Sequence, residues 1–184
     1  MANRTDWALV ESQLAALLEG TDVWVSVLAN ASAHLMESLD DLNWVGFYLT
    51  GRVLGQRVGE DELALGPFQG RVACERIASG RGVCGNALAR DETIRVDDVH
   101  KFAGHIACDS ASRAEIVVPL HVGGHVVGVL DVDSPHLERF DAADQAGLEA
   151  CVRIIERFLP QDHDPAVGLW SVLTTNPQRD RGQN

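Results

Sequence analysis

"EIVVPLHVGGHVVGVLDVDS", residues 115–134, decides the fold. Two apolar runs rich in valine flank the pair Gly123-Gly124. A glycine pair in this setting is typical of a tight β-hairpin, because such turns need backbone conformations that glycine adopts freely. Pro119 cannot donate a backbone hydrogen bond, so its strand has an unpaired position or an edge there. The stretch therefore predicts two antiparallel strands.

The hairpin carries three carboxylates whose arrangement depends on its register. Asp131 and Asp133 are two residues apart on one strand and so point to one face. A two-residue turn would pair Ile116 with Asp131 and place Glu115 on the opposite face. Convergence of all three needs a longer loop, a bulge, or a Glu115 that precedes the paired region. The alternative is that the two aspartates form the solvated end of the strand.

Grouped carboxylates would have a definite chemistry. Without a basic partner they repel one another, so they favour a bound cation, either a metal or an ammonium group. Crowding also raises the pKa of at least one member, which provides a proton donor.

Working outward, the periodicity of apolar residues predicts the remaining elements. We expect helices over 5–20, 21–38, 82–90 and 141–159, and strands over 43–49, 63–68, 71–77 and 93–99. Residues 50–62 form a long hairpin connection, and 100–113 form a long loop. This order predicts an α+β domain with a mostly antiparallel sheet flanked by helices. Residues 1–160 form the single domain, and 161–184 form a polar tail.

The composition excludes several classes of protein. The chain has 184 residues and a formal net charge of -12, which disfavours nucleic acids and anionic membrane surfaces. The amino terminus lacks the basic and apolar regions of a signal peptide, and no apolar run is long enough to span a bilayer. We therefore expect a cytoplasmic protein.

The four cysteines fall into different settings. Cys151 lies on an apolar helix face, which favours a role as a small core residue. Cys108 lies in the polar loop between His105 and Asp109, where it is either a reactive thiol or a buried structural one. Cys74 and Cys84 lie upstream and offer partner thiols that could resolve a sulfenic acid.

Two further sets of residues have alternative interpretations. A metal could be held by His100, His105 and Cys108, but the spacings common in zinc sites are absent. Trp44 and Tyr48 are four apart and so share one strand face, where they either pack in the core or form an aromatic wall around a ligand.

Several motifs together resemble one known family, the free methionine-(R)-sulfoxide reductases built on a GAF domain. The resemblance covers residues 5–158 and rests on NWVGFYL, LGPFQGRVAC, GRGVCGNA, DVHKFAGHIACDSASRAEIVVPL and GVLDVDS. It implies a central antiparallel sheet flanked by helices, often in a homodimer. The longer connection over 50–62 and the polar tail depart from the family pattern.

The resemblance also implies residue roles. Cys108 would be the catalytic thiol, with Cys74 and Cys84 as resolving cysteines. Substrate would be held by carboxylates at positions 115, 131 and 133 and by aromatic rings at positions 44 and 48. The implied reaction needs no cofactor and reduces free methionine (R)-sulfoxide through a sulfenic acid and an intramolecular disulfide, which a thioredoxin-type protein reduces. The alternative is a non-catalytic GAF sensor of a small molecule, of a metal or of redox state.

Overall fold

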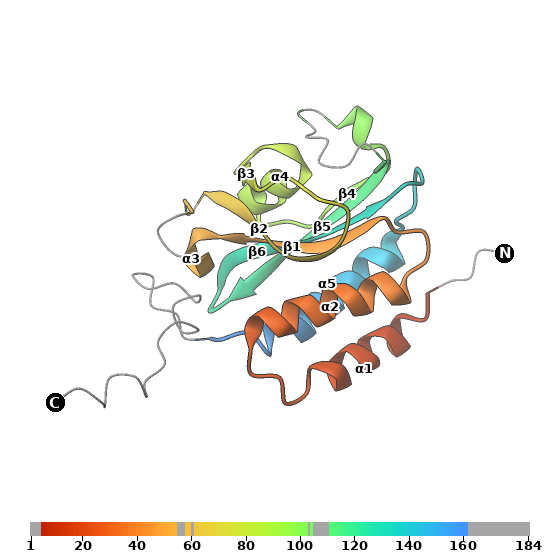
Figure 1. Cartoon of the computed structure of the whole chain (residues 1–184). Coiled ribbons are helices and arrows are strands. Elements are labelled where there is room, and N and C mark those ends of the chain that lie inside the picture. Colours follow the sequence, from red (N-terminus) through yellow and green to blue (C-terminus); the bar gives the residue numbers. More distant parts are fainter. Residues whose placement is uncertain (1–4, 55–57, 60, 103, 105–110, 162–184) are drawn as a thin grey trace.

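The computed structural model describes residues 5–54, 58–59, 61–102, 104 and 111–161, and six strands within them form one sheet (Figure 1). Every neighbouring pair is antiparallel, and the strand order is β3-β2-β1-β6-β5-β4. The strands are β1 (Trp44–Thr50), β2 (Glu62–Gly70), β3 (Arg76–Ala78), β4 (Ile94–Val96), β5 (Ala114–Val122) and β6 (His125–Ser134). The predicted α+β class with an antiparallel sheet is confirmed.

Helices cover both faces of the sheet (Figure 1). The helices are α1 (Trp7–Leu18), α2 (Trp24–Ser38), α3 (Gly51–Leu54), α4 (Gly82–Arg90) and α5 (Ala142–Glu156), with a 3-10 turn at Val99–Lys101. Helices α2 and α5 pack on one face of the sheet, α1 packs against these two helices on the side away from the sheet (Figure 1), and all three contribute to the larger apolar core. Helix α4 covers part of the other face, where a second apolar cluster includes side chains of β1 and α4. No helix within the described ranges is long and apolar enough to cross a membrane.

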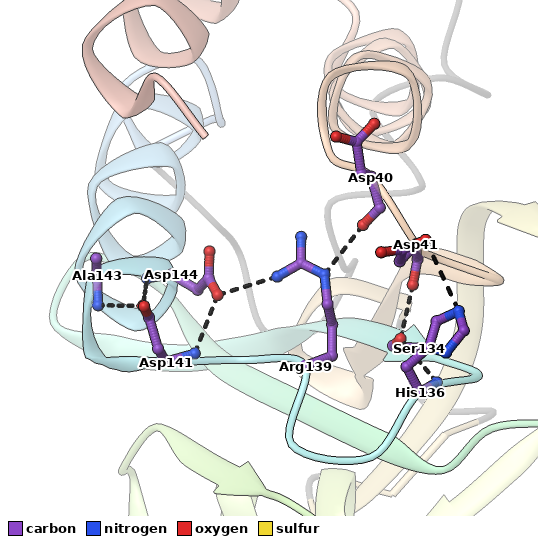
Figure 2. Close-up of polar contacts among 8 residues, drawn as sticks. All are labelled: Asp40, Asp41, Ser134, His136, Arg139, Asp141, Ala143 and Asp144. Carbon is purple, nitrogen blue, oxygen red and sulfur yellow. Dashed lines mark hydrogen bonds and ion pairs between the residues drawn. The ribbon is translucent and has the colours of Figure 1, made fainter. Parts of the chain in front are cut away.

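A network of polar contacts fixes the start of α5 (Figure 2). Asp141 accepts hydrogen bonds from the backbone N–H groups of Ala143 and Asp144 at 2.7 and 2.9 Å. Asp144 in turn accepts from the backbone of Asp141 at 3.0 Å, which completes a capping box. Arg139 bridges Asp144 and the backbone carbonyl of Asp40, each at 3.0 Å, and so ties α5 to the segment after α2.

The β5–β6 hairpin contains a one-residue bulge near its turn. Val122 pairs with His125 and His121 with Val126, as a two-residue turn requires, but Leu120 pairs with Gly128. Val127 is therefore the extra residue, and it packs in the helix-side core. Beyond the bulge the register differs by one residue from that of an unbroken hairpin.

Three local predictions need comment. The strand expected over 71–77 is wrong for most of its length, because strand β3 begins only at Arg76. Gly70 ends β2 with a φ of 131°, a conformation that L side chains rarely adopt.

The long connection after β1 contains the short helix α3. Pro119 lies beyond the last β5 residue that β4 pairs, which is Val117, so the predicted unpaired position is confirmed.

Candidate active site

The bulge brings the three carboxylates of the hairpin to one face. Glu115 pairs directly with Asp133, and Val117 pairs with Asp131. Paired residues point to the same side of a sheet, so positions 115, 131 and 133 share the face opposite the three-helix layer. The sequence left three ways for the carboxylates to converge: a longer loop, a bulge, or a Glu115 outside the paired region. The structure contains the bulge.

Helix α4 adds a thiol to this group. Cys84 lies in the first turn of α4, is 3% exposed, and its thiol donates to Glu115 Oε1 at 3.8 Å. Ligand atoms of Cys84, Glu115 and Asp131 all lie within 4.8 Å of one another. Glu115 and Asp131 are 7% and 6% exposed. Asp131 Oδ1 is buried and has no hydrogen-bond partner in the described structure.

Burial dominates the electrostatics of this cluster. It raises the pKa of Asp131 to about 7, although hydrogen bonds from Cys84 and Glu115 favour the ionised form. The pKa of Glu115 is also raised well above its ordinary value, first by burial and then by the charges of Asp131 and Asp133. The same causes, burial and then Asp131 and Glu115, raise the pKa of the Cys84 thiol. The carboxyl pair therefore holds a proton at neutral pH.

These three residues are also the only ones within the described residues that form a group close enough to share a cation. The high pKa of each member opposes metal binding, because a ligand must give up its proton. Of the metal ligands considered from the sequence, His100 lies 3.3 Å from Asp98, whereas His105 and Cys108 lie outside the described residues.

Aromatic rings line the same face beside the carboxylates. Trp44 stacks on Tyr48, with ring centroids 5.8 Å apart, and on Phe68, with centroids 5.3 Å apart. Trp44 and Tyr48 belong to the buried apolar cluster on this face, and Phe68 packs against it. The predicted pairing of Trp44 and Tyr48 on one face is confirmed, and Phe68 of β2 extends the wall.

The polar atoms of this wall hold the chain segment that carries Cys74. Trp44 Nε1 donates to the carbonyl of Arg71 at 3.1 Å, and the Tyr48 hydroxyl donates to the carbonyl of Cys74 at 3.2 Å. Burial raises the pKa of Tyr48, so this hydroxyl keeps its proton. These two hydrogen bonds hold residues 71–74, which were expected to lie in a strand, against β1.

Gly46 lets the Trp44 ring lie against the sheet, which leads to a stability prediction. A Cβ at Gly46 would lie 2.4 Å from Phe68 Cβ and 2.5 Å from the Trp44 ring. We expect Gly46→Ala to lower the free energy of unfolding by about 1–3 kcal/mol through overpacking, measured by urea denaturation. Gly59→Ala is the control, because its nearest neighbour would be 3.7 Å away. Equal stability of the two variants would contradict this packing.

The cysteines differ in state and surroundings. Cys74 takes part in a disulfide bond, whereas Cys84 and Cys151 are free thiols. Cys151 lies in the helix-side core, as predicted, and burial raises its pKa to about 12. Cys108, the predicted catalytic thiol, lies outside the described residues.

Two features of the site were not found in the sequence. The contact between Cys84 and Glu115 joins residues 31 positions apart, and no local pattern signals it. Phe68 lies in a predicted strand. The β1 residue with which it pairs, Gly46, lies beside an irregularity in the β1–β2 register that the sequence does not show.

Comparisons with known proteins place this site in a family. The model of the GAF domain matches residues 14–159. The chain is 48% identical over 158 residues to the free methionine-R-sulfoxide reductase of Escherichia coli (strain K12), which covers 85% of this chain and 91% of that protein.

Solved structures agree with this similarity. The reduced form of fRMsr of Staphylococcus aureus is 47% identical and has a TM-score of 0.79, with 86% of this chain and 97% of that chain covered. The free methionine-R-sulfoxide reductase of Neisseria meningitidis in complex with its substrate is 45% identical and has a TM-score of 0.76, with 83% and 87% covered. The chain therefore belongs to the free methionine-R-sulfoxide reductases, which are oxidoreductases built on a GAF domain.

Proposed function

We propose that this protein reduces free methionine (R)-sulfoxide to methionine by thiol chemistry. The observation that carries the proposal is the buried group of Glu115, Asp131 and Cys84 beside an aromatic wall on one sheet face. This group offers a proton and negative charge next to an apolar surface. Relatives of this chain carry the name of the same activity.

The first step uses Cys108 as the nucleophile. Its thiolate attacks the sulfur of the sulfoxide, and the sulfoxide oxygen gains a proton and passes to the cysteine. Methionine leaves, and the thiol has become a sulfenic acid. The cysteine sulfur is oxidised by two electrons, and the substrate sulfur is reduced by two. This role rests on the motif around Cys108.

The proton comes from the carboxyl pair. Glu115 and Asp131 hold a proton at neutral pH because burial raises the pKa of both. A carboxylic acid in this state is a general acid suited to a sulfoxide oxygen that becomes basic as its bond to sulfur breaks. Either acid of the pair could deliver the proton, directly or through a water molecule.

The same group also binds the substrate. Asp131 Oδ1 has no hydrogen-bond partner among the described residues, and Asp133 lies on the same face, so both attract the α-ammonium of a free amino acid. The rings of Trp44 and Tyr48 flank the methyl sulfoxide group. The hydrogen bonds of both rings go to residues 71–74, so the rings act through their apolar faces.

Cys74 completes the cycle as the resolving thiol. It condenses with the sulfenic acid of Cys108, which forms a disulfide and releases water. Cys74 already takes part in a disulfide bond, which supports this choice over Cys84, a free thiol. An external dithiol protein of the thioredoxin type then reduces the disulfide. The homodimer that the family resemblance implies remains part of the proposal.

An activity assay with separate epimers tests the function. Purified protein is supplied with thioredoxin, its reductase and either epimer of free methionine sulfoxide, and methionine formation is measured. We expect turnover of the (R) epimer alone. Turnover of neither epimer, or of the (S) epimer instead, would refute the proposal.

A further inference from the structure

We infer that Cys84 is a positioning residue, which donates a hydrogen bond to Glu115 and takes no part in disulfide exchange during turnover. The inference deepens the proposed reductase function and rests on it. It assigns different roles to Cys84 and Cys74, although both cysteines precede Cys108 in the sequence.

The first support is the fixed position of Cys84. Asn86 of the same helix donates to the carbonyls of Gly80 and Gly82 at 3.1 and 2.6 Å, and the backbone N–H of Gly80 donates to the carbonyl of Gly85 at 2.7 Å. A Cβ at Gly85 would lie 2.3 Å from the carbonyl oxygen of Ala78, so the helix packs closely on the end of β3. These contacts fix the backbone that carries the Cys84 thiol, so any large displacement of the thiol would break them.

The second support is the poor access and low reactivity of the thiol. Cys84 is 3% exposed and lies within an apolar cluster, so an external dithiol protein cannot reach it in this structure. Thiol–disulfide exchange needs a thiolate. Burial, and then the charges of Asp131 and Glu115, raise the pKa of Cys84 and so oppose the loss of its proton. Cys74, by contrast, is only partly buried and is already disulfide-bonded.

The third support is what a protonated thiol does at this place. It donates to Glu115 Oε1 at 3.8 Å, within the range of a hydrogen bond from sulfur. Among the residues that the structure describes, the titratable groups facing Glu115 are Cys84 from α4, Tyr48 from β1, and Asp131 and Asp133 from β6. Strand β4 presents Val96 opposite it. The thiol stabilises the ionised form of Glu115 against these negative charges. It therefore opposes the rise in the pKa of Glu115, the acid that shares the proton with Asp131.

Redox state after one turnover gives the first test. Reduced enzyme is mixed with (R)-sulfoxide without reductant, denatured and alkylated, and the cysteines are assigned by mass spectrometry. We expect Cys84 to be alkylated as a free thiol and Cys74 to be found in a disulfide. Cys84 in a disulfide would overturn the inference.

Serine variants give a second test by thioredoxin-driven turnover. Cys74→Ser should slow cycling at least tenfold, because the resolving sulfur is lost. Cys84→Ser should lose no more than about fivefold, since its hydroxyl still donates to Glu115. Cys151→Ser is the matched control for the loss of a buried thiol. If Cys84→Ser slows cycling as much as Cys74→Ser does, Cys84 is a resolving cysteine and the inference fails.

A third test needs no substrate, so it is independent of the proposed function. The infrared carbonyl stretch of the protonated carboxyl pair, identified by its loss in Glu115→Gln, is titrated with pH. Cys84→Val removes the donor but fills its space, so the band should persist to a pH higher by about half to one unit. Cys84→Ser should restore the wild-type titration, and Cys151→Val should not alter it. An unchanged titration in Cys84→Val would overturn the inference, whereas inactive wild-type enzyme would refute only the proposed function.

Discussion

Turnover of free methionine (R)-sulfoxide is expected to fall by at least about a thousandfold when Cys108 is replaced by serine, because removal of a nucleophile eliminates the covalent step. A serine hydroxyl is not ionised at neutral pH and cannot take up the sulfoxide oxygen, whereas a cysteine sulfur does so and becomes a sulfenic acid. Excess small-molecule dithiol should not restore activity, since the missing sulfur is the one that attacks. The measurement is kcat in the thioredoxin-coupled assay.

A measurement of substrate binding distinguishes loss of the nucleophile from misfolding of the Cys108→Ser variant. Cys108→Ser retains the carboxylates and the aromatic wall, so calorimetry should still detect binding of the (R)-sulfoxide. Cys151→Ser serves as the control variant, because its thiol lies in the core away from the site. Residual activity of Cys108→Ser within tenfold of the wild type would show that another group is the nucleophile.

The second large effect concerns the size and charge of the substrate. N-acetylation removes the ammonium that Asp131 and Asp133 attract, and Asp131 Oδ1 would stay buried without a partner. Loss of one member of a buried ion pair costs roughly 3–5 kcal/mol. We therefore expect kcat/KM on N-acetyl methionine (R)-sulfoxide to be at least about a hundredfold lower than on the free amino acid.

The comparison requires the same epimer of both compounds. A matched variant, Asp131→Asn, should narrow the ratio between the two substrates, because the amide attracts an ammonium less strongly. Methionine sulfoxide within a peptide should behave like the acetylated compound. Equal efficiency on free and acetylated substrate in the wild type would eliminate the ammonium pocket.

The sequence predicted the fold class because the evidence for it is local. Apolar spacing located the helices, and Gly123-Gly124 located the hairpin turn. The strand expected over 71–77 failed over its first residues, where the backbone carbonyls of Arg71 and Cys74 accept hydrogen bonds from the side chains of Trp44 and Tyr48. Such contacts between distant segments override local propensity.

The sequence proposed residues for the candidate site but did not predict how they are arranged. The two-residue spacing of Asp131 and Asp133 predicts that they share a face. The face on which Glu115 lies depends on a β-bulge, and no residue pattern indicates where that bulge occurs. The depth of Cys84 follows from the packing of Gly85 on β3. The raised pKa values of the carboxyl pair arise from burial, which only the assembled fold creates.

The bulge at Val127 has a consequence for how the length of this hairpin can vary in evolution. An in-frame deletion of that one codon would join Val126 to Gly128, so Leu120 would still pair with Gly128 and Glu115 with Asp133. A homologue that lacks the extra residue can therefore keep its acids on one face with an unbroken hairpin. The bulge absorbs one added residue, so homologues can differ in hairpin length by one codon and retain the same arrangement of acids.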